Sequence, residues 1–348
     1  MIIKSLAKKM PSRHVSNDQP PYCDIPNLPS NWWRFWGIEK RYLLDRDKGE
    51  TALENAVEAS NKAIEISGLN PEDIDVILCN STCFVGWSDD YLKAFPRFSH
   101  QLKSRINCEK ALGIDVEQEC ITFLISLQIA EHYISSGLAK NILICSSEYI
   151  SNVLDFTDLS STTFGDGTVA AVVSYDKNQK ATGLLSSSYG SNADFYDIAM
   201  VKWGTPVNAD PNSSKAALKE RYWSYFTLDK NAPMDMQKFV PQVVPSAIRE
   251  ALKKSNLSTE EIDYYVFHQP SKILVDLWAN NIGIDYDKYL LTLKDYGCMV
   301  SVSMPITLYE SIKLGKINPG DNIVIAGAAT GWGYGAQVWK IDNQIKIN

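Results

Sequence analysis

Long apolar segments are missing from this chain of 348 residues. No run approaches the roughly 20 consecutive apolar residues that a membrane-spanning helix needs. The first residues, MIIKSL, hold too few apolar positions for a signal peptide. We therefore expect a cytoplasmic protein with no membrane partner. The apolar fraction of 45% and the charged fraction of 22% are typical of a globular protein.

An excess of positive charge is also absent. The formal net charge is -7, so there is no electrostatic reason to expect nucleic acid as a partner. The cysteines show no paired spacing, since they stand at positions 23, 79, 83, 108, 120, 145 and 298. Four histidines and dispersed carboxylates form no metal-ligand cluster. The sequence thus predicts neither a disulfide framework nor a metal site.

One cysteine stands where a thiol can be reactive. Cys120 follows a predicted strand over residues 112–119 and precedes an apolar helix that begins Ile-Thr-Phe-Leu. Amide dipoles at a helix start favour the thiolate, which is the nucleophilic form of cysteine. Cys120 is therefore a candidate nucleophile that carries an acyl group. From its position alone, a buried cysteine that packs as a small hydrophobe is the more common alternative.

The order of predicted elements repeats along the chain. Helix–strand units over residues 53–79 and 129–144 recur in the same order over residues 244–267 and 307–325. Continuous apolar strands that alternate with helices are typical of sheets buried on both faces. The sequence therefore predicts two duplicated α/β halves with stacked layers of helix and sheet.

Polar residues follow the predicted strands in both halves. Asn-Ser-Thr at residues 80–82 and His-Gln-Pro-Ser at residues 268–271 stand directly after apolar runs. Ligands of α/β proteins bind at the carboxyl ends of strands, so we expect these clusters near one site. Residues 192–231, rich in Asp, Pro, Trp and Tyr, are predicted to be an irregular insertion that walls a pocket.

Short motifs occur in a fixed order along the chain. They are Gly-Ile-Glu-Lys-Arg at 37–41, Glu-Cys-Ile-Thr-Phe at 119–123, Ser-Gly-Leu-Ala-Lys-Asn at 136–141, Phe-Gly-Asp-Gly at 164–167, Phe-His-Gln at 267–269, Tyr-Gly at 296–297 and Gly-Trp-Gly-Tyr-Gly at 331–335. In this order they resemble the β-ketoacyl-acyl-carrier-protein synthase III group of the thiolase superfamily, nearly from end to end.

The resemblance implies a thiolase-like fold. Two duplicated α/β halves, residues 1–178 and 179–348, would form a layered α-β-α-β-α core. The first half would carry the nucleophile, and the second half the histidine and the glycine-rich loop. The family's cavity is walled by a loop of a neighbouring subunit, which implies a homodimer or a heterodimer with a related synthase. The aromatic region at residues 84–98 is the candidate loop, with core packing as its alternative.

The resemblance also implies roles for individual residues. Cys120 would attack an acyl thioester, and His268 would act as acid or base on the second substrate or on a developing enolate. The backbone N–H groups of Cys120, Thr330 and Gly331 would form the oxyanion hole. The plainer alternatives are a hydrogen-bonded core histidine and a tight glycine turn.

Cys298 stands where the family has its third catalytic residue, an asparagine. That asparagine helps the histidine to stabilise the enolate formed when a malonyl thioester loses carbon dioxide. A thiol is a far weaker hydrogen-bond donor than an amide. The sequence therefore favours acyl loading on Cys120 over decarboxylative condensation. Cys298 is either a second reactive thiol or a residue that fills space.

The surroundings of the nucleophile also depart from the family pattern. Glu117 and Glu119 replace small residues, and Thr122 replaces a glycine. Strand alternation would place both carboxylates on one face. If that face is turned to the site, either is a possible extra base. A carboxylate beside the thiol would also oppose formation of the thiolate.

The residues expected to bind the acyl thioester donor are only partly present. Trp32 or Trp33, with Arg34, lies near one side of the family's sandwich for the coenzyme A adenine but out of register, and Leu159 replaces the arginine of the other side. Lys272 lies near the position of a basic residue that docks the carrier. We expect an acyl-carrier-protein or coenzyme A thioester as a substrate, with carrier protein as the favoured carrier of the acyl group, and no tightly bound cofactor.

These observations support three hypotheses. The first is a synthase III-like acyltransferase or condensing enzyme of specialised metabolism, which loads an acyl group on Cys120 and transfers it with the help of His268. The second is an ordinary decarboxylating synthase that uses a malonyl thioester. The third is a non-catalytic partner subunit, which the presence of both Cys120 and His268 disfavours.

Overall fold

The computed structural model describes residues 1–81, 96–176, 182–203, 224–228, 232–341 and 344–348. Within this part, strands form two main sheets. In spatial order, the first contains β14 (Lys346–Ile347), β1 (Ile2–Lys9), β7 (Gly167–Ser174), β6 (Asn141–Glu148), β4 (Val76–Asn80) and β5 (Leu112–Asp115). The second contains β11 (Tyr264–Phe267), β12 (Asn322–Ala328), β13 (Gly333–Lys340) and β8 (Gly183–Ser191).

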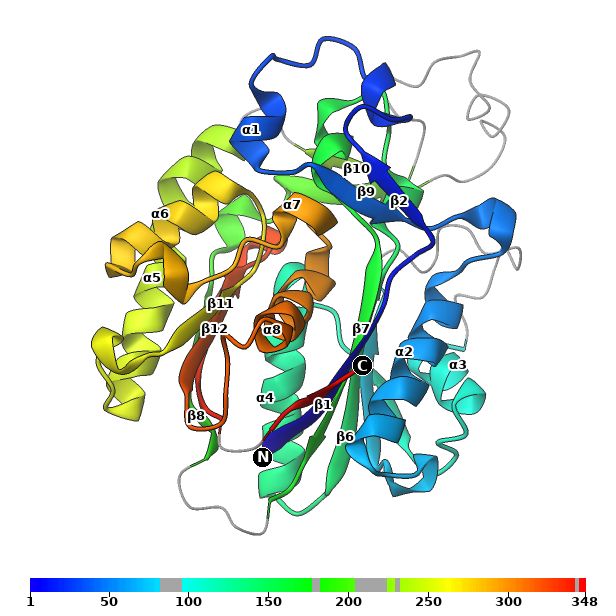
Figure 1. The fold of residues 1–348 in the computed structure, drawn as a ribbon, viewed down its shortest axis with the longest axis vertical. Helices are drawn as coiled ribbons and strands as arrows, with labels where there is room; N and C mark the ends of the chain where they lie inside the picture. Colours follow the sequence, from blue (N-terminus) through cyan, green and yellow to red (C-terminus); the bar gives the residue numbers. More distant parts are fainter. Residues whose placement is uncertain (82–95, 177–181, 204–223, 229–231, 342–343) are drawn as a thin grey trace.

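Helices cover both faces of each sheet, which gives five layers (Figure 1). The six longest described helices are α2 (Ala52–Ser67), α3 (Phe98–Arg105), α4 (Thr122–Ser135), α5 (Ala232–Ser255), α6 (Lys272–Ile282) and α8 (Ser303–Lys313). α2 and α3 pack on the outer face of the first sheet, and α5 packs on the outer face of the second, with α6 beside it. α4 and α8 lie between the sheets and contact both of them. The predicted thiolase-like α-β-α-β-α core is confirmed.

Each layer is held by its own set of apolar side chains. The largest buried cluster lies between the sheets and includes Leu127 of α4 and Leu308 of α8. A second cluster lies under α5 and α6, and a third lies under α2 and α3. The strands of these layers are almost continuously apolar because both faces are covered. In the described part of the chain, no helix is long and apolar enough to cross a membrane.

The parallel strands bring the predicted site residues to one edge of the sheets. β4 and β6 run parallel, with Asn80 opposite Ser146. β11 and β12 also run parallel, with Phe267 opposite Ala326. The carboxyl ends of each pair therefore lie at the same edge, as the duplicated helix–strand units predicted.

The region predicted as an irregular insertion contains regular structure. β9 (Ala199–Trp203) and β10 (Ser224–Leu228) form an antiparallel hairpin, and residues 204–223 between them lie outside the described part. β9 packs on a glycine-rich turn after β12, and β10 packs on η5 (Ile150–Val153) of the first half. The prediction of an irregular segment was wrong for these residues, because Phe226 pairs with Val201 and Thr227 pairs with Met200 across the two strands.

The remaining short elements lie at the edge that carries the site. α1 (Trp32–Trp36) packs against α6, and α7 (Leu293–Tyr296) packs against β3 (Lys40–Leu43). β3 pairs with β2 (Arg13–Ser16). The predicted domain boundary at residue 178 and most of the predicted dimer loop at 84–98 lie outside the described residues, so both stay predictions.

Candidate active site

Cys120 lies at the entrance of a buried helix. It belongs to the short 3-10 helix η4 (Glu119–Ile121), and α4 begins two residues later. The preceding strand was predicted to run to residue 119 but ends at Asp115. The Cys120 side chain is 9% exposed, and its thiol accepts a hydrogen bond from the backbone N–H of Thr330.

The environment of Cys120 favours the thiol over the thiolate. Burial raises the pKa of Cys120 well above its ordinary value, and the negative charges of Cys298, Glu119 and Glu148 raise it further. The hydrogen bond from the Thr330 N–H lowers the pKa of Cys120. The expectation of a stabilised thiolate is wrong for the protein without substrate, because desolvation and negative neighbours outweigh the donor at the helix start.

His268 follows β11 and faces the end of β12. Its backbone N–H donates to the carbonyl of Ala326 over 2.9 Å, and its side chain is 2% exposed. Burial lowers the pKa of His268 to about 3, so the imidazole is neutral at physiological pH. Its Nδ1 atom has no hydrogen-bond partner among the described residues. A Cβ at Gly327 would lie 2.6 Å from the His268 Cβ, so glycine permits this close approach.

The glycine-rich turn η12 (Thr330–Trp332) brings a backbone donor to Cys120. Gly331 has φ +83°, a conformation that glycine adopts without strain. Ala329 donates to the carbonyl of Gly333 over 2.7 Å, which closes the turn. The ends of β12 and β13 pack against η4. The structure thus places the Thr330 amide at the Cys120 sulfur, while Gly331 lies one residue further along the same turn.

Cys298 is fixed by its backbone in a buried loop. Its N–H donates to the Thr163 carbonyl over 2.8 Å, and its carbonyl accepts from Gly165 over 3.0 Å. Its side chain is 5% exposed and packs with Ile38 and Leu293. Burial raises the pKa of Cys298 to about 11. The charge of Cys298 acts on Cys120, so Cys298 lies near the candidate nucleophile.

The two halves contain the same tight turn before their central helices. We call residues 118–122 the first elbow and residues 299–303 the second elbow. Glu119 has φ +42° in the first elbow and Val300 has φ +45° in the second. A left-handed backbone is uncommon for residues other than glycine. The duplicated fold therefore imposes this conformation in both halves, and the two elbows pack against each other.

A hydroxyl closes each elbow in the same way. In the first, the Gln118 N–H donates to the Thr122 Oγ1 over 2.9 Å. In the second, the Met299 N–H donates to the Ser303 Oγ over 2.9 Å. The Thr122 hydroxyl also donates to the carbonyl of Glu119 over 2.8 Å. Thr122, which departs from the family's glycine, thus bonds the backbone of both Gln118 and Glu119.

The matched positions of the elbows carry Cys120 and Ser301. Ser301 Oγ donates a short hydrogen bond to the carboxylate of Glu148, which is 1% exposed at the end of β6. Asn80 Nδ2, at the end of β4, donates to Glu148 over 3.0 Å and contacts the Ser301 Oγ at the same distance. This polar cluster was missed in the sequence, although Asn80 was singled out as polar after a strand. An acidic residue that ends the apolar β6 was the signal for Glu148.

The two carboxylates before Cys120 have different environments. Glu117 is exposed, whereas Glu119 is partly buried. Burial and the charge of Glu148 raise the pKa of Glu119. The prediction that strand alternation gives both residues one face was wrong, because β5 ends at Asp115 and Glu119 has a left-handed backbone.

The predicted donor-binding residues lie together at α1 and α6. Trp32 is partly buried, and its Nε1 donates to the Thr162 hydroxyl over 2.8 Å. Arg34 is exposed on the same short helix. Lys272 begins α6 and forms an ion pair with Asp276. These contacts account for Trp32 and Lys272 without a ligand, so their binding roles stay predictions.

The Phe-Gly-Asp-Gly motif is held by hydrogen bonds to its buried aspartate. The Asp166 carboxylate accepts from the Leu44 N–H over 2.8 Å and from the Ser151 N–H over 2.9 Å, and burial raises its pKa to about 6. These hydrogen bonds support the Phe-Gly-Asp-Gly motif as a structural turn.

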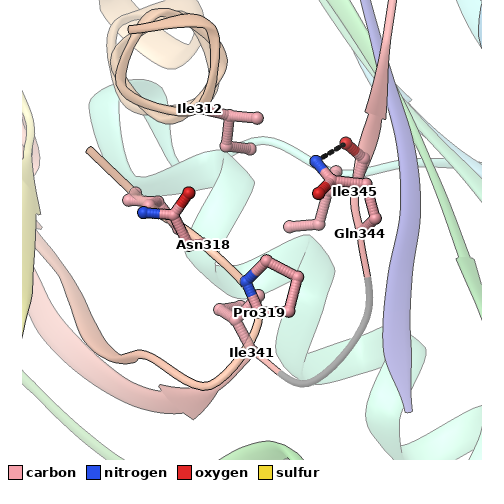
Figure 2. Close-up of a pocket in the computed structure, with 7 residues that line it drawn as sticks. Ile312, Asn318, Pro319, Ile341, Gln344 and Ile345 are labelled. Carbon is pink, nitrogen blue, oxygen red and sulfur yellow. Dashed lines mark hydrogen bonds between the residues drawn. The ribbon is translucent and has the colours of Figure 1, made fainter. Parts of the chain in front are cut away.

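The small pocket in Figure 2, near Pro319 and Gln344, is lined by none of the candidate catalytic residues.

Comparison with known proteins defines the family. Residues 114–193 match the model of 3-oxoacyl-[acyl-carrier-protein] synthase III, and residues 252–341 match that of its C-terminal part. The chain is 38% identical to the 2-heptyl-4(1H)-quinolone synthase subunit PqsC of Pseudomonas aeruginosa, over 97% of both chains. It is 32% identical to a β-ketoacyl-[acyl-carrier-protein] synthase III of Clostridium perfringens, over 88% of both.

Solved structures show the same fold. The crystal structure of 3-oxoacyl-[acyl-carrier-protein] synthase III from Aquifex aeolicus superposes with a TM-score of 0.82 and 23% sequence identity, over 97% of this chain and 99% of that one. The motifs, the five-layered core and the relatives that match almost the whole chain lead to one conclusion. The protein belongs to the 3-oxoacyl-[acyl-carrier-protein] synthase III family of condensing enzymes, within the thiolase superfamily.

Proposed function

We propose that the protein is an acyltransferase of specialised metabolism that loads an acyl group on Cys120 and transfers it to a second substrate. The observation that carries this proposal is the hydrogen bond from the Thr330 amide to the Cys120 thiol. An N–H group directed at the nucleophile can also stabilise the oxyanion that forms when the thiol attacks a thioester. The Cys120 amide, at the start of α4, would be its second donor.

His268 would act on the second substrate. A buried imidazole with a pKa near 3 stays neutral, so it serves as a hydrogen-bond donor or as a base for a proton that is lost at the moment of bond formation. Cys298, which replaces the family's asparagine, has no side-chain amide that could assist His268. This supports transfer to an acceptor that does not depend on an asparagine-stabilised enolate, as the sequence suggested.

The similarity to a quinolone synthase subunit narrows the substrate class. A 2-heptyl-4(1H)-quinolone combines an alkyl chain with a nitrogen-containing bicyclic ring. For this chain we propose a medium-length acyl group as the loaded group and an aromatic amine with an activated carbon as the acceptor. The relative is named a subunit, which supports a complex with a second, related chain. A homodimer is the alternative.

Intact-protein mass spectrometry tests the loading step. The protein is incubated with octanoyl-coenzyme A and with octanoyl-acyl-carrier-protein. We expect the mass of one acyl group on the wild type and none on Cys120→Ala. Cys23→Ser, which changes an exposed cysteine, is the matched control and should load normally. The absence of an adduct from both donors would refute the proposal.

A decarboxylating synthase is the second candidate, favoured by the family itself. Release of carbon dioxide from a malonyl thioester, measured in the wild type and in His268→Ala, separates the two. Release that depends on His268 would support the second candidate.

A non-catalytic subunit is tested by double alanine replacement of Cys120 and His268. Unchanged product formation in the double variant, with loss of product on deletion of the chain, would support that reading.

A further inference from the structure

A buried glutamine ties β13 of the second half to α4 of the first half. The Nε2 of Gln337, which is fully buried in β13, donates to the backbone carbonyl of Leu124 in α4 over 3.0 Å. The same nitrogen donates to the Tyr189 hydroxyl on β8 over 2.7 Å. Its Oε1 accepts from the indole N–H of Trp339 over 2.9 Å. We call Gln337, Tyr189 and Trp339 the α4 brace.

The partners of the brace hold the Gln337 amide in one orientation. The Trp339 indole can only donate and the Leu124 carbonyl can only accept, so the oxygen and the nitrogen of the amide cannot exchange places. Burial raises the pKa of Tyr189 to about 12, so its hydroxyl keeps its proton. That hydroxyl lies 3.4 Å from the Leu124 carbonyl and 3.4 Å from the Gln128 Oε1. The brace therefore directs two donors at the same part of α4.

The matched strand of the first half has no polar side chain at this position. β7 and β13 both contain eight residues and begin with glycine, and their last residues pair with the first residues of β6 and β12. This register matches Ala171 of β7 with Gln337 of β13. Ala171 is buried in the apolar cluster between the sheets. β7 packs on the second elbow and β13 on the first. The duplicated fold thus forms without a glutamine, and the glutamine is on the strand beside Cys120.

The brace joins the two elements that meet at the Cys120 sulfur. The Thr330 amide, which donates to Cys120, belongs to η12, directly before β13. β13 begins against η4, since a Cβ at Gly333 would lie 3.0 Å from an η4 side chain. Further along β13, Gln337 reaches Leu124, about one helical turn beyond Cys120. The two elements are therefore tied at two points, once at the sulfur and once at the brace.

The two ties differ in strength. Sulfur is a weak hydrogen-bond acceptor, so the contact from Thr330 to Cys120 cannot by itself fix β13 against α4. The Gln337 amide is buried, and a buried amide that loses its partners is costly, so it keeps them. A hydrogen bond also weakens steeply as its angle departs from linear. Small shifts of β13 along α4 would thus misdirect the Thr330 amide, and the brace opposes such shifts.

We propose that Gln337 is a positioning residue for the loading step. It holds β13 against α4 so that the Thr330 amide points at the Cys120 sulfur and, during attack on the thioester, at the oxyanion. Gln337 itself does not touch the acyl group, and it lies outside the motifs that the chain shares with its family. Tyr189 and Trp339 keep its amide oriented. The inference rests on the proposed loading of Cys120.

Single-turnover loading of Gln337→Met tests this role. Methionine has nearly the same length but cannot replace the three hydrogen bonds. Loading from octanoyl-coenzyme A is measured over a range of donor concentrations. We expect the maximal rate to fall about tenfold, less than the roughly 100-fold loss on removal of an oxyanion donor, because the amide is displaced and not removed. The half-saturating donor concentration should stay unchanged. A raised half-saturating concentration with an unchanged maximal rate would overturn the proposal.

Two further variants separate positioning from general stability. Ser186 of β8 donates to the Ala251 carbonyl of α5 over 2.6 Å, so Ser186→Ala removes a tie between the same sheet and its outer helix. This variant should lose stability but load normally. Equal losses of loading in Ser186→Ala and Gln337→Met would show a general loosening and refute the role of Gln337. Tyr189→Phe removes only a partly exposed hydroxyl, so it remains informative if Gln337→Met does not fold. We expect its loading to fall about threefold, and a wild-type rate would contradict the brace.

Hydrogen exchange at the Thr330 amide separates this inference from the proposed function. Exchange is followed by mass spectrometry of the η12 peptide and needs no acyl donor. We expect exchange about tenfold faster in Gln337→Met than in the wild type, and unchanged in Ser186→Ala. If the wild type accepts no acyl group, the proposed function fails while exchange still tests the brace. Equal exchange in the wild type and in Gln337→Met would overturn the role of Gln337.

Discussion

The two elbows have one backbone and different chemistry. Each has a left-handed residue, a hydroxyl that closes the turn and a buried helix after it. At the matched position the first elbow has Cys120, whose thiol contacts the Thr330 amide, and the second has Ser301, whose hydroxyl donates to Glu148. The comparison shows that the duplicated fold supplies two equivalent sites for a side chain. One carries the candidate nucleophile, and the other joins residues of the two halves.

Moving the thiol from one elbow to the other is expected to have the largest effect. In the double variant Cys120→Ser with Ser301→Cys, the thiol lies beside Glu148 and away from the Thr330 amide. We expect acyl loading to fall at least about 1,000-fold, to the level of Cys120→Ser alone. Loading of the double variant at a rate near that of the wild type would show that the two positions are chemically equivalent.

Removal of the histidine is expected to separate the two chemical steps. In His268→Ala, Cys120 and Thr330 are unchanged, so loading should continue. Transfer to the acceptor should slow by about 100-fold to 1,000-fold, which is typical for loss of a general base. Single-turnover measurement of both steps checks this. A loss of loading as large as the loss of transfer would contradict the assignment of His268 to the acceptor.

Loss of the hydroxyl in the second elbow is expected to reduce stability. Ser301→Ala leaves the buried Glu148 carboxylate without one of its donors, which costs about 1–3 kcal/mol of unfolding free energy. Cys120→Ala at the matched position leaves no buried carboxylate short of a donor and should cost less. Chemical denaturation of both variants gives the two values. Equal losses would mean that Ser301 is not the more important structural anchor.

Two buried groups are expected to respond to acid in opposite ways. The folded-state pKa of His268 is about 3, below its ordinary value of 6.5, so the unfolded chain binds more protons between these values. His268 therefore lowers stability as the pH falls, by up to about 1.4 kcal/mol per pH unit. Asp166 has a folded-state pKa of about 6, above its ordinary 3.8, so it raises stability as the pH falls from 6 toward 3.8.

Each contribution is isolated by comparison with a variant. The difference in unfolding free energy between the wild type and His268→Asn should decrease as the pH falls from about 6 to about 4. The difference between the wild type and Asp166→Asn should increase over the same interval. A His268 difference that does not depend on pH would contradict the buried neutral imidazole.

Much of the architecture follows from local patterns in the sequence. The repeated helix–strand units predicted α2, β4, β11 and β12, because apolar periodicity and turn residues are local signals. The motifs also placed Cys120 correctly before the start of α4.

The finer geometry depends on contacts that a sequence does not display. Glutamate and valine give no sign of a left-handed turn, so the elbows could not be predicted from residue preference. The cluster of Asn80, Glu148 and Ser301 joins residues from both halves and forms only when the sheets pack. The raised pKa of Cys120 depends on the same packing. The helix start alone therefore predicted a lowered pKa, which is the wrong direction.

The central claim is that Cys120, rather than another thiol near the site, carries the acyl group. Peptide mapping after incubation with octanoyl-coenzyme A and rapid acid quench tests this most directly. The account predicts an acyl label on the peptide that contains Cys120, which disappears when the acceptor is added. A label on the peptide of Cys298, or a label on Cys120 that no acceptor removes while product still forms, would contradict it.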